Sequence, residues 1–218
     1  MPTILSIDFV GGVSSGGAGG VSMTMVMEPD EVAGVRPAAR WNAAAGPTST
    51  TGLTPLLLSN GTSTTAKVTW EALGTATSAG IWSAKMVDAP GDTRMMNGYL
   101  DPAMGTNPMA TVTVSGLPTA MGSYDIYVYF MASLLSDGET RTHTLKVVTT
   151  ASTSFTVSQT GKSPTTFPGY TLATATTGNY VIFRKQTGAT FTLTSTAVSG
   201  TPMRAPINGL QIVWPAAP

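Results

Sequence analysis

Residues 189–194, Ala-Thr-Phe-Thr-Leu-Thr, alternate small or apolar side chains with threonine. Neighbouring side chains of an extended strand point to opposite faces, so Phe191 and Leu193 would face a core while the threonines face solvent. The stretch therefore predicts a β-strand with one buried face. Residues 124–130, Tyr-Asp-Ile-Tyr-Val-Tyr-Phe, show the same alternation, with the aliphatic residues on one face and Tyr127 and Tyr129 on the other.

Similar short runs, rich in Val, Ile, Thr, Phe and Tyr, recur along the chain at intervals of about 8 to 12 residues between Gly, Pro, Ser and Asn clusters. The predicted strands cover residues 3–10, 21–27, 53–58, 66–72, 94–100, 110–115, 124–131, 140–149, 154–158, 180–185, 190–196 and 207–213. We therefore predict an all-β protein: a two-sheet antiparallel β-sandwich, jelly-roll-like, with long loops and at most one short helix. At most one or two helical turns would fit in the alanine-containing stretch 28–46.

The length of 218 residues fits one β-sandwich domain spanning residues 1–218. Within it, residues 11–20 form a glycine-rich loop and residues 28–52 an irregular segment. The sequence Ser115-Gly116-Leu117-Pro118 joins two predicted strands and has the residues of a turn. It predicts either a hairpin or a corner at which the chain crosses between sheets.

Charge and cysteine content exclude several classes of function. The chain has 11 basic and 11 acidic residues, which cancel, and no cysteine. A neutral chain cannot attract phosphate-rich partners, so we predict no nucleic-acid partner. Apolar stretches fall well short of the roughly 20 residues that cross a bilayer, which predicts no membrane insertion, and the first residues show no signal sequence. Neutral sugars and further copies of the chain are the partners that this charge balance favours.

The sequence does not predict an enzyme. Gly12-Val13-Ser14-Ser15-Gly16 matches a serine-hydrolase pattern by its letters, but the glycines that follow are a poor helix start, and a nucleophile elbow needs a helix there. His143 is the only histidine and lies on the apolar side of a predicted strand. We interpret it as a structural, hydrogen-bonded residue.

Carboxylates gather at two predicted turns. Asp88 lies close in sequence to Asp92, and Asp137 to Glu139. Oxygen ligands of this type bind calcium when several converge, so the four are candidate ligands of a structural calcium ion. The alternative is that they are solvated turn residues.

Four segments together resemble a known type of domain: residues 7–12, 92–101, 112–130 and 204–213. They are similar to β-sandwich domains embedded in large secreted proteins of environmental bacteria, most of them uncharacterised. The first and last segments also resemble the malectin and galactose-binding-like jelly rolls, whose terminal strands lie side by side in one sheet. This resemblance implies a jelly-roll sandwich located outside the cell or on its surface. It also implies relatives that commonly bind carbohydrate, some of them with a structural calcium.

Aromatic and polar residues in loops or on strand faces are the candidate ligand-binding residues, because sugars stack on aromatic rings and hydrogen-bond to planar polar groups. They are Trp41, Trp82, Arg94, Asn97, Tyr99, Tyr127 and Tyr129. Each type has a structural alternative: the tryptophans would plug the ends of the sandwich, Arg94 would pair with a nearby carboxylate, and the two strand tyrosines would lie buried under a loop. Trp70 and Trp214 lie in or beside predicted strands and are assigned to packing.

Two hypotheses of function follow. The first is a non-catalytic extracellular module that binds a neutral polysaccharide or glycan through loop aromatics. The second is a structural subunit that assembles with itself into an extracellular filament or surface layer, for which a neutral sandwich with unpaired edge strands is suited.

Overall fold

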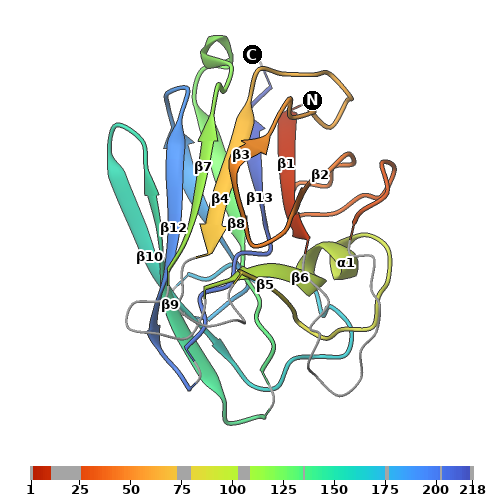
Figure 1. Ribbon diagram of the computed structural model, residues 1–218, viewed down its shortest axis with the longest axis vertical. Helices are drawn as coiled ribbons and strands as arrows, with labels where there is room; N and C mark the ends of the chain where they lie inside the picture. Colours follow the sequence, from red (N-terminus) through yellow and green to blue (C-terminus); the bar gives the residue numbers. More distant parts are fainter. Residues whose placement is uncertain are drawn as a thin grey trace.

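Two large β-sheets pack face to face in the computed structural model (Figure 1), which describes residues 2–10, 26–72, 80–102, 109–134, 136–174, 177–201 and 203–216. The five-stranded sheet has the order β11-β8-β13-β1-β2, the six-stranded sheet the order β10-β9-β12-β7-β4-β3, and β5 and β6 form a separate pair. The strands are β1 (Thr3–Val10), β2 (Asn42–Ala45), β3 (Thr48–Leu53), β4 (Lys67–Ala72), β5 (Gly80–Ser83), β6 (Gly98–Asp101), β7 (Met109–Ser115), β8 (Tyr124–Tyr129), β9 (Thr140–Val148), β10 (Ser152–Thr160), β11 (Tyr180–Gln186), β12 (Phe191–Ser199) and β13 (Gly209–Trp214). All pairings between these strands are antiparallel except that of β1 with β2. The fold is thus the predicted all-β sandwich.

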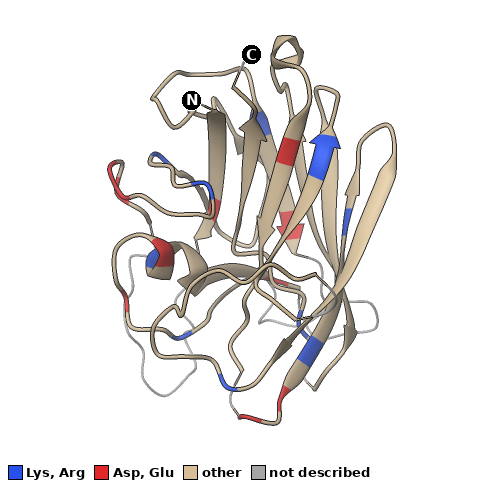
Figure 2. Ribbon diagram, turned by 180° about the vertical axis from the view of Figure 1, so that it is seen from behind, with Lys and Arg blue, Asp and Glu red and all other residues tan. Residues whose placement is uncertain are grey.

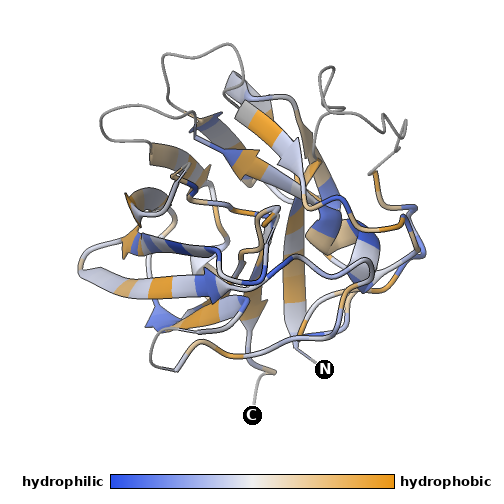
Figure 3. Cartoon of the chain, turned by 90° about the horizontal axis from the view of Figure 1, so that it is seen from below, coloured by the Kyte–Doolittle hydropathy of each residue, from blue (hydrophilic) through white to orange (hydrophobic). Residues whose placement is uncertain are grey.

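Alternation along the strands builds the main core between the two sheets. Strand β7 has buried and partly exposed residues in strict alternation, and β12 begins in the same way. The interleaved hydrophobic and hydrophilic positions are visible in Figure 3. Phe9 meets Trp70 edge-on across the core, with ring centroids 6.3 Å apart, and Tyr124 lies 5.7 Å from Trp214. Trp70 and Trp214 are packing residues, as predicted.

The two ends of the chain meet in one sheet. Strand β1 runs antiparallel to β13, with Thr3 opposite Trp214 and Asp8 opposite Gly209. Adjacent terminal strands are what the resemblance to jelly rolls implies. The turn at 115–118 is a corner between sheets, because β7 belongs to the six-stranded sheet and β8 to the five-stranded one. Gly116 has a φ of 70° there, and a Cβ would lie 2.5 Å from the carbonyl oxygen of Thr65, so no other residue fits.

One prediction about the first half of the chain is wrong. The segment 28–52, predicted to be irregular, contains β2 and most of β3. Residues 28–46 contain no helix, which is within the predicted limit of one or two turns. The alanines of β2 favour helix in isolation, but small side chains fit against β1, where Ala44 is fully buried. Asn42 holds this strand through its side-chain amide, which donates to the carbonyl oxygens of Ser6 and Leu57.

Other strand predictions also need correction. Residues 94–97, predicted to begin a strand, belong to the helix α1 (Asp92–Asn97), which buries Met95 and Met96. Residues 54–58 hold only isolated bridges, at Leu57 and Leu58. The glycine-rich loop 11–20 and most of the predicted strand 21–27 lie outside the described residues, and residues 26 and 27 are not in a strand. Within the part of the chain that the structure describes, no helix has the length and apolarity needed to cross a membrane.

Candidate functional site

The outer face of the five-stranded sheet is covered by chain segments and holds a second hydrophobic cluster, which we call the covered face. Its covering residues come from 27–41, from 84–96 and, in part, from 167–170. Four of the predicted binding residues, Trp41, Tyr99, Tyr127 and Tyr129, lie in this cluster, and Trp82 packs against it. The structure therefore brings together residues that are far apart in the sequence, but most of them are buried.

The two strand tyrosines lie under the covering segments. Tyr129 is 0% and Tyr127 6% exposed. The Tyr129 hydroxyl donates to Gln211 Oε1 at 2.5 Å and accepts from the backbone N–H of Val35 at 2.9 Å. Burial raises the pKa of Tyr129. Both tyrosines are therefore buried under covering segments, which is the structural alternative to a role in binding. Tyr129 also anchors one of these segments.

Trp41 and Tyr99 are buried in the same way. Trp41 is 6% exposed, and its indole N–H donates to the carbonyl oxygen of Ala38 at 2.9 Å. Tyr99 is 0% exposed, and its hydroxyl accepts from the backbone N–H of Ser133 at 3.2 Å. The polar atoms of both side chains thus form hydrogen bonds within the protein.

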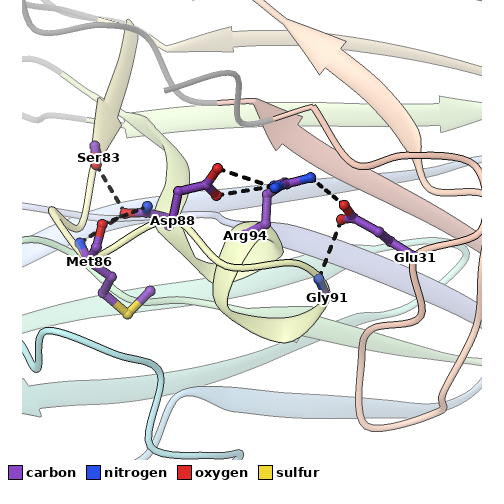
Figure 4. A network of polar contacts seen from close by, with 7 residues as sticks. Glu31, Ser83, Met86, Asp88, Gly91 and Arg94 are labelled. Carbon is purple, nitrogen blue, oxygen red and sulfur yellow. Dashed lines mark hydrogen bonds and ion pairs between the residues drawn. The ribbon is translucent and has the colours of Figure 1, made fainter. Parts of the chain in front are cut away.

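Arg94 and Asn97 hold the covering segments together (Figure 4). The Arg94 guanidinium donates from Nε and Nη2 to the two carboxylate oxygens of Asp88, at 3.1 and 3.2 Å, and from Nη1 to Glu31. The hydrogen bond to Asp88 raises the pKa of Arg94 against the effect of burial. Asn97 is fully buried, and its Oδ1 accepts from Ser83 Oγ and from the backbone N–H of Met86. Arg94 thus pairs with a nearby carboxylate, which is the structural alternative to a role in binding.

The four candidate calcium ligands lie in two places. Asp88 pairs with Arg94, and Asp92 Oδ1 accepts from Tyr170 OH at 2.6 Å and from the backbone N–H of Gly34 at 2.8 Å. Asp137 is exposed, and Glu139 pairs with Arg141. Among the described residues no three of the types His, Asp and Glu come close enough to hold a metal ion. A structural calcium stays a prediction.

Trp82 is the one predicted binding aromatic that is partly exposed. It lies on β5, and the guanidinium carbon of Arg204 stands 5.3 Å from its ring centroid. Arg204 in turn pairs with Asp101, which is fully buried. Burial raises the pKa of Asp101 to about 7, against the opposing charge of Arg204. Sequence reasoning missed both Asp101 and Arg204, although Arg204 opens the segment before the last strand.

A hollow lies on the outer face of the six-stranded sheet, where β3 leaves β4 and β7. Its volume is about 270 Å³, and it is lined by Ser49, Thr50, Thr69, Trp70, Glu71, Thr111 and Thr113. Strand β3 shifts register between Ser49 and Leu53, and the Ser49 hydroxyl accepts from the backbone N–H of Gly52 at 2.9 Å. The lining residues that the structure describes offer hydroxyls, one carboxylate and part of the Trp70 ring, and include neither Lys nor Arg. None of the predicted binding residues lines it, although strand alternation does place its threonines on the outer face.

Comparison with known proteins does not assign this chain to a family. No family model matches the sequence, and no curated protein matches it. Among solved structures the chain is similar to TmCBM61, a carbohydrate-binding module determined in complex with beta-1,4-galactotriose. The TM-score is 0.35 and the sequence identity 11%, over 66% of this chain and 83% of that chain. Similarity at this level assigns neither a ligand nor a binding residue to the present protein.

Proposed function

We propose that this chain is a non-catalytic module that binds neutral glycans outside the cell or on its surface. The observation that carries the proposal is the hollow at β3, β4 and β7, whose lining consists of Ser and Thr hydroxyls, the Glu71 carboxylate and part of Trp70. Sugar hydroxyls both donate and accept hydrogen bonds, as do Ser and Thr side chains. The Glu71 carboxylate would accept from two such hydroxyls.

The outer face around the hollow carries few charges: Glu71 lies in the lining, and Lys67 lies two residues before Thr69 on the same face of β4. Cross-strand hydroxyl pairs continue over the same sheet, with Thr113 and Thr192 3.3 Å apart and Thr144 and Thr156 3.1 Å apart. Charged residues are few and scattered over the strands (Figure 2), and the whole chain is neutral. A neutral polyhydroxyl ligand fits this surface, because its hydroxyls would donate to the Glu71 carboxylate and exchange hydrogen bonds with the Ser and Thr hydroxyls.

Trp82, which lies on β5 and not in a loop, is the predicted binding aromatic that this proposal retains. Its ring is partly exposed, and Arg204 lies over it. A sugar would contact the accessible part of this pair. The other aromatics would act only by keeping the covering segments in place.

The surroundings of His143 agree with a non-catalytic role. His143 is 0% exposed, and burial lowers its pKa to about 3. A general base has to reach its substrate and to titrate near the working pH. His143 meets neither condition in this structure. The prediction that it is hydrogen-bonded is wrong for the described residues, because neither ring nitrogen has a partner among them.

Titration calorimetry with a set of neutral oligosaccharides tests the proposal. We expect Glu71→Gln and Thr113→Val to weaken binding at least tenfold, because each removes a hydrogen-bonding group from the hollow. Thr194→Val is the matched control, since Thr194 faces outward on the same sheet but does not line the hollow. Loss of binding in Trp82→Ala alone would place the glycan at the end of the sandwich, and wild-type protein that binds no neutral glycan would reject the function.

Self-assembly is a second candidate, and strand β10 favours it. This strand forms an edge of the six-stranded sheet and has neither a charged residue nor proline over Ser152–Thr160. Such an edge lacks the usual protection against pairing with another chain. Among the described residues, Ser158 alone has a bridge on the outer side of this strand, to Thr177.

Sedimentation velocity over a range of concentrations tests this candidate. A lysine on the edge, Ser154→Lys, should abolish any association, whereas Thr194→Lys on the interior strand β12 should not. A wild-type protein that stays monomeric at every concentration would reject self-assembly.

A further inference from the structure

Several buried polar atoms at one end of the sandwich have no hydrogen-bond partner. Among the described residues these are Nδ1 and Nε2 of His143, Oγ of Ser195, Nε of Arg141, Nε of Arg204 and Oδ1 of Asp101. We call these five residues the polar end. Buried polar groups are nearly always hydrogen-bonded, and each group left without a partner destabilises the folded state. So many in one region indicate that something supplies the missing bonds.

Strand pairing places His143, Ser195 and Arg141 together. In the pairing of β9 with β12, His143 lies opposite Ala197 and Leu145 lies opposite Ser195. His143 and Ser195 are therefore diagonal neighbours, about 7–8 Å apart by the usual geometry of a sheet. Both are 0% exposed and face the core. Arg141 lies two residues before His143 on the same face, and its side chain is 3% exposed.

Arg141 connects this pair to Asp101 and Arg204. Asp101 and Arg204 form an ion pair, and the charge of Arg141 acts on the carboxyl of Asp101 as well. Arg141 and Arg204 also influence each other electrostatically. The Phe130 ring meets the His143 imidazole edge-on, with centroids 5.1 Å apart, and so forms an apolar wall on the core side. His143, Ser195 and Arg141 thus face the space between the sheets, and Arg141 is the member that interacts electrostatically with Asp101 and Arg204.

The unpartnered atoms define the kind of group that would satisfy them. The Arg141 and Arg204 Nε–H groups only donate, and an ionised Asp101 only accepts. A neutral imidazole and a serine hydroxyl each offer one donor and at least one acceptor. Arg141 pairs with Glu139 and Arg204 with Asp101, so no net charge would attract an ion, and an apolar group would leave every atom without a partner. A group that both donates and accepts, namely O–H, matches the whole set.

We infer that the polar end is an internal binding site for hydroxyl groups, supplied by confined water or by a small neutral sugar or polyol. This inference goes beyond the proposed function, because the polar end lies between the sheets and the hollow lies on an outer face. Arg204 offers a route inward, since its side chain is 15% exposed while its partner Asp101 is fully buried.

His143 provides the measurement, because it is the only histidine in the chain. In ¹⁵N-labelled full-length protein its ring gives a single set of long-range ¹H–¹⁵N signals. Nuclear Overhauser contacts from water to the ring protons would report confined water. Titration with D-galactose, D-glucose and glycerol would report a sugar or polyol through shifts of the ring nitrogens.

Ser195→Ala adds a test whose sign separates an occupied site from a dry one. If the Ser195 hydroxyl is bound by a water or ligand hydroxyl, the variant loses a hydrogen bond and its Tm falls. If the site is dry, the variant removes an unpartnered hydroxyl and its Tm rises. Ser199→Ala, at an exposed position of the same strand, is the control and should leave the Tm unchanged.

Each result has one meaning. Water contacts to His143 without any sugar response identify water as the source, and ring-nitrogen shifts on adding sugar or polyol identify that ligand. Absence of both, with a raised Tm for Ser195→Ala, overturns the inference. A glycan that binds without moving the His143 signals supports the proposed function and removes the sugar source. A hydrated His143 in a protein that binds no glycan supports the inference and rejects the function.

Discussion

Arg94 and Asp88 form a two-bond ion pair in which Nε and Nη2 donate to separate carboxylate oxygens at 3.1 and 3.2 Å. The same guanidinium also reaches Glu31, so one side chain joins two segments that cover the five-stranded sheet. The pair is part of what keeps the aromatic cluster of the covered face away from solvent.

Arg94→Lys tests the importance of this geometry. An ammonium cannot form the paired bonds of a planar guanidinium, so we expect a loss of about 1 kcal/mol in the free energy of unfolding, measured by urea titration. Arg184→Lys is the control, because Arg184 is 62% exposed and makes one bond to Asp125 at 3.3 Å. Equal effects of the two substitutions would show that the paired geometry contributes nothing.

Tyr129→Phe tests the anchor beneath the covering segments. The variant removes the hydrogen bonds to Gln211 and to the backbone N–H of Val35, both in a buried setting. We expect a loss of about 1–3 kcal/mol in the free energy of unfolding. Tyr127→Phe, on the same strand and face, is the control, since no hydrogen bond of its hydroxyl is found among the described residues. A Tyr129→Phe variant as stable as wild type would contradict the assignment.

His143→Leu should change how stability depends on pH. Burial lowers the pKa of His143 from 6.5 to about 3, so between these values the unfolded chain binds a proton that the folded chain does not. This histidine therefore makes the folded state less stable as the pH falls from 6.5 toward 3, by about 1.4 kcal/mol per pH unit. The leucine variant should lack that contribution. Urea titrations from pH 7 to pH 4 check it, and unchanged slopes would contradict it.

Asp101→Asn should have the opposite effect. Burial raises the pKa of Asp101 from 3.8 to about 7, so between these values the folded chain holds a proton that the unfolded chain has lost. This carboxyl thus makes the folded state less stable as the pH rises from 3.8 to 7. In wild-type protein it offsets the contribution of His143. We expect stability to rise with pH more steeply in Asp101→Asn than in wild type over pH 4 to 6.5, and an equal slope would refute the assignment.

The strands with clear alternation could be predicted from the sequence, because alternation reflects which face of a strand is buried. Residues 3–10 are β1 as predicted, and the strands around Val112 and Leu193 are close to their predicted bounds. Strand β2 could not be predicted, since its alanines are placed by contact with β1 rather than by their own preference. Helix α1 is too short to show a helical period.

The surroundings of the candidate residues depend on contacts between distant segments. Tyr127 and Tyr129 were placed on the correct face by alternation, but only the covering segments decide that they are buried. The hollow depends on the register shift of β3, which no local pattern encodes. The polar end could not be predicted from the sequence either, because its residues come from four distant segments: β6, β9, β12 and the segment before β13.

Calorimetric titration of neutral oligosaccharides into wild-type, Glu71→Gln and Thr194→Val proteins tests the central claim most directly. The proposal predicts that at least one neutral glycan binds wild type and Thr194→Val equally and binds Glu71→Gln at least tenfold more weakly. Binding that is the same in all three proteins would contradict the site in the hollow. Absence of binding to wild type would contradict the function itself.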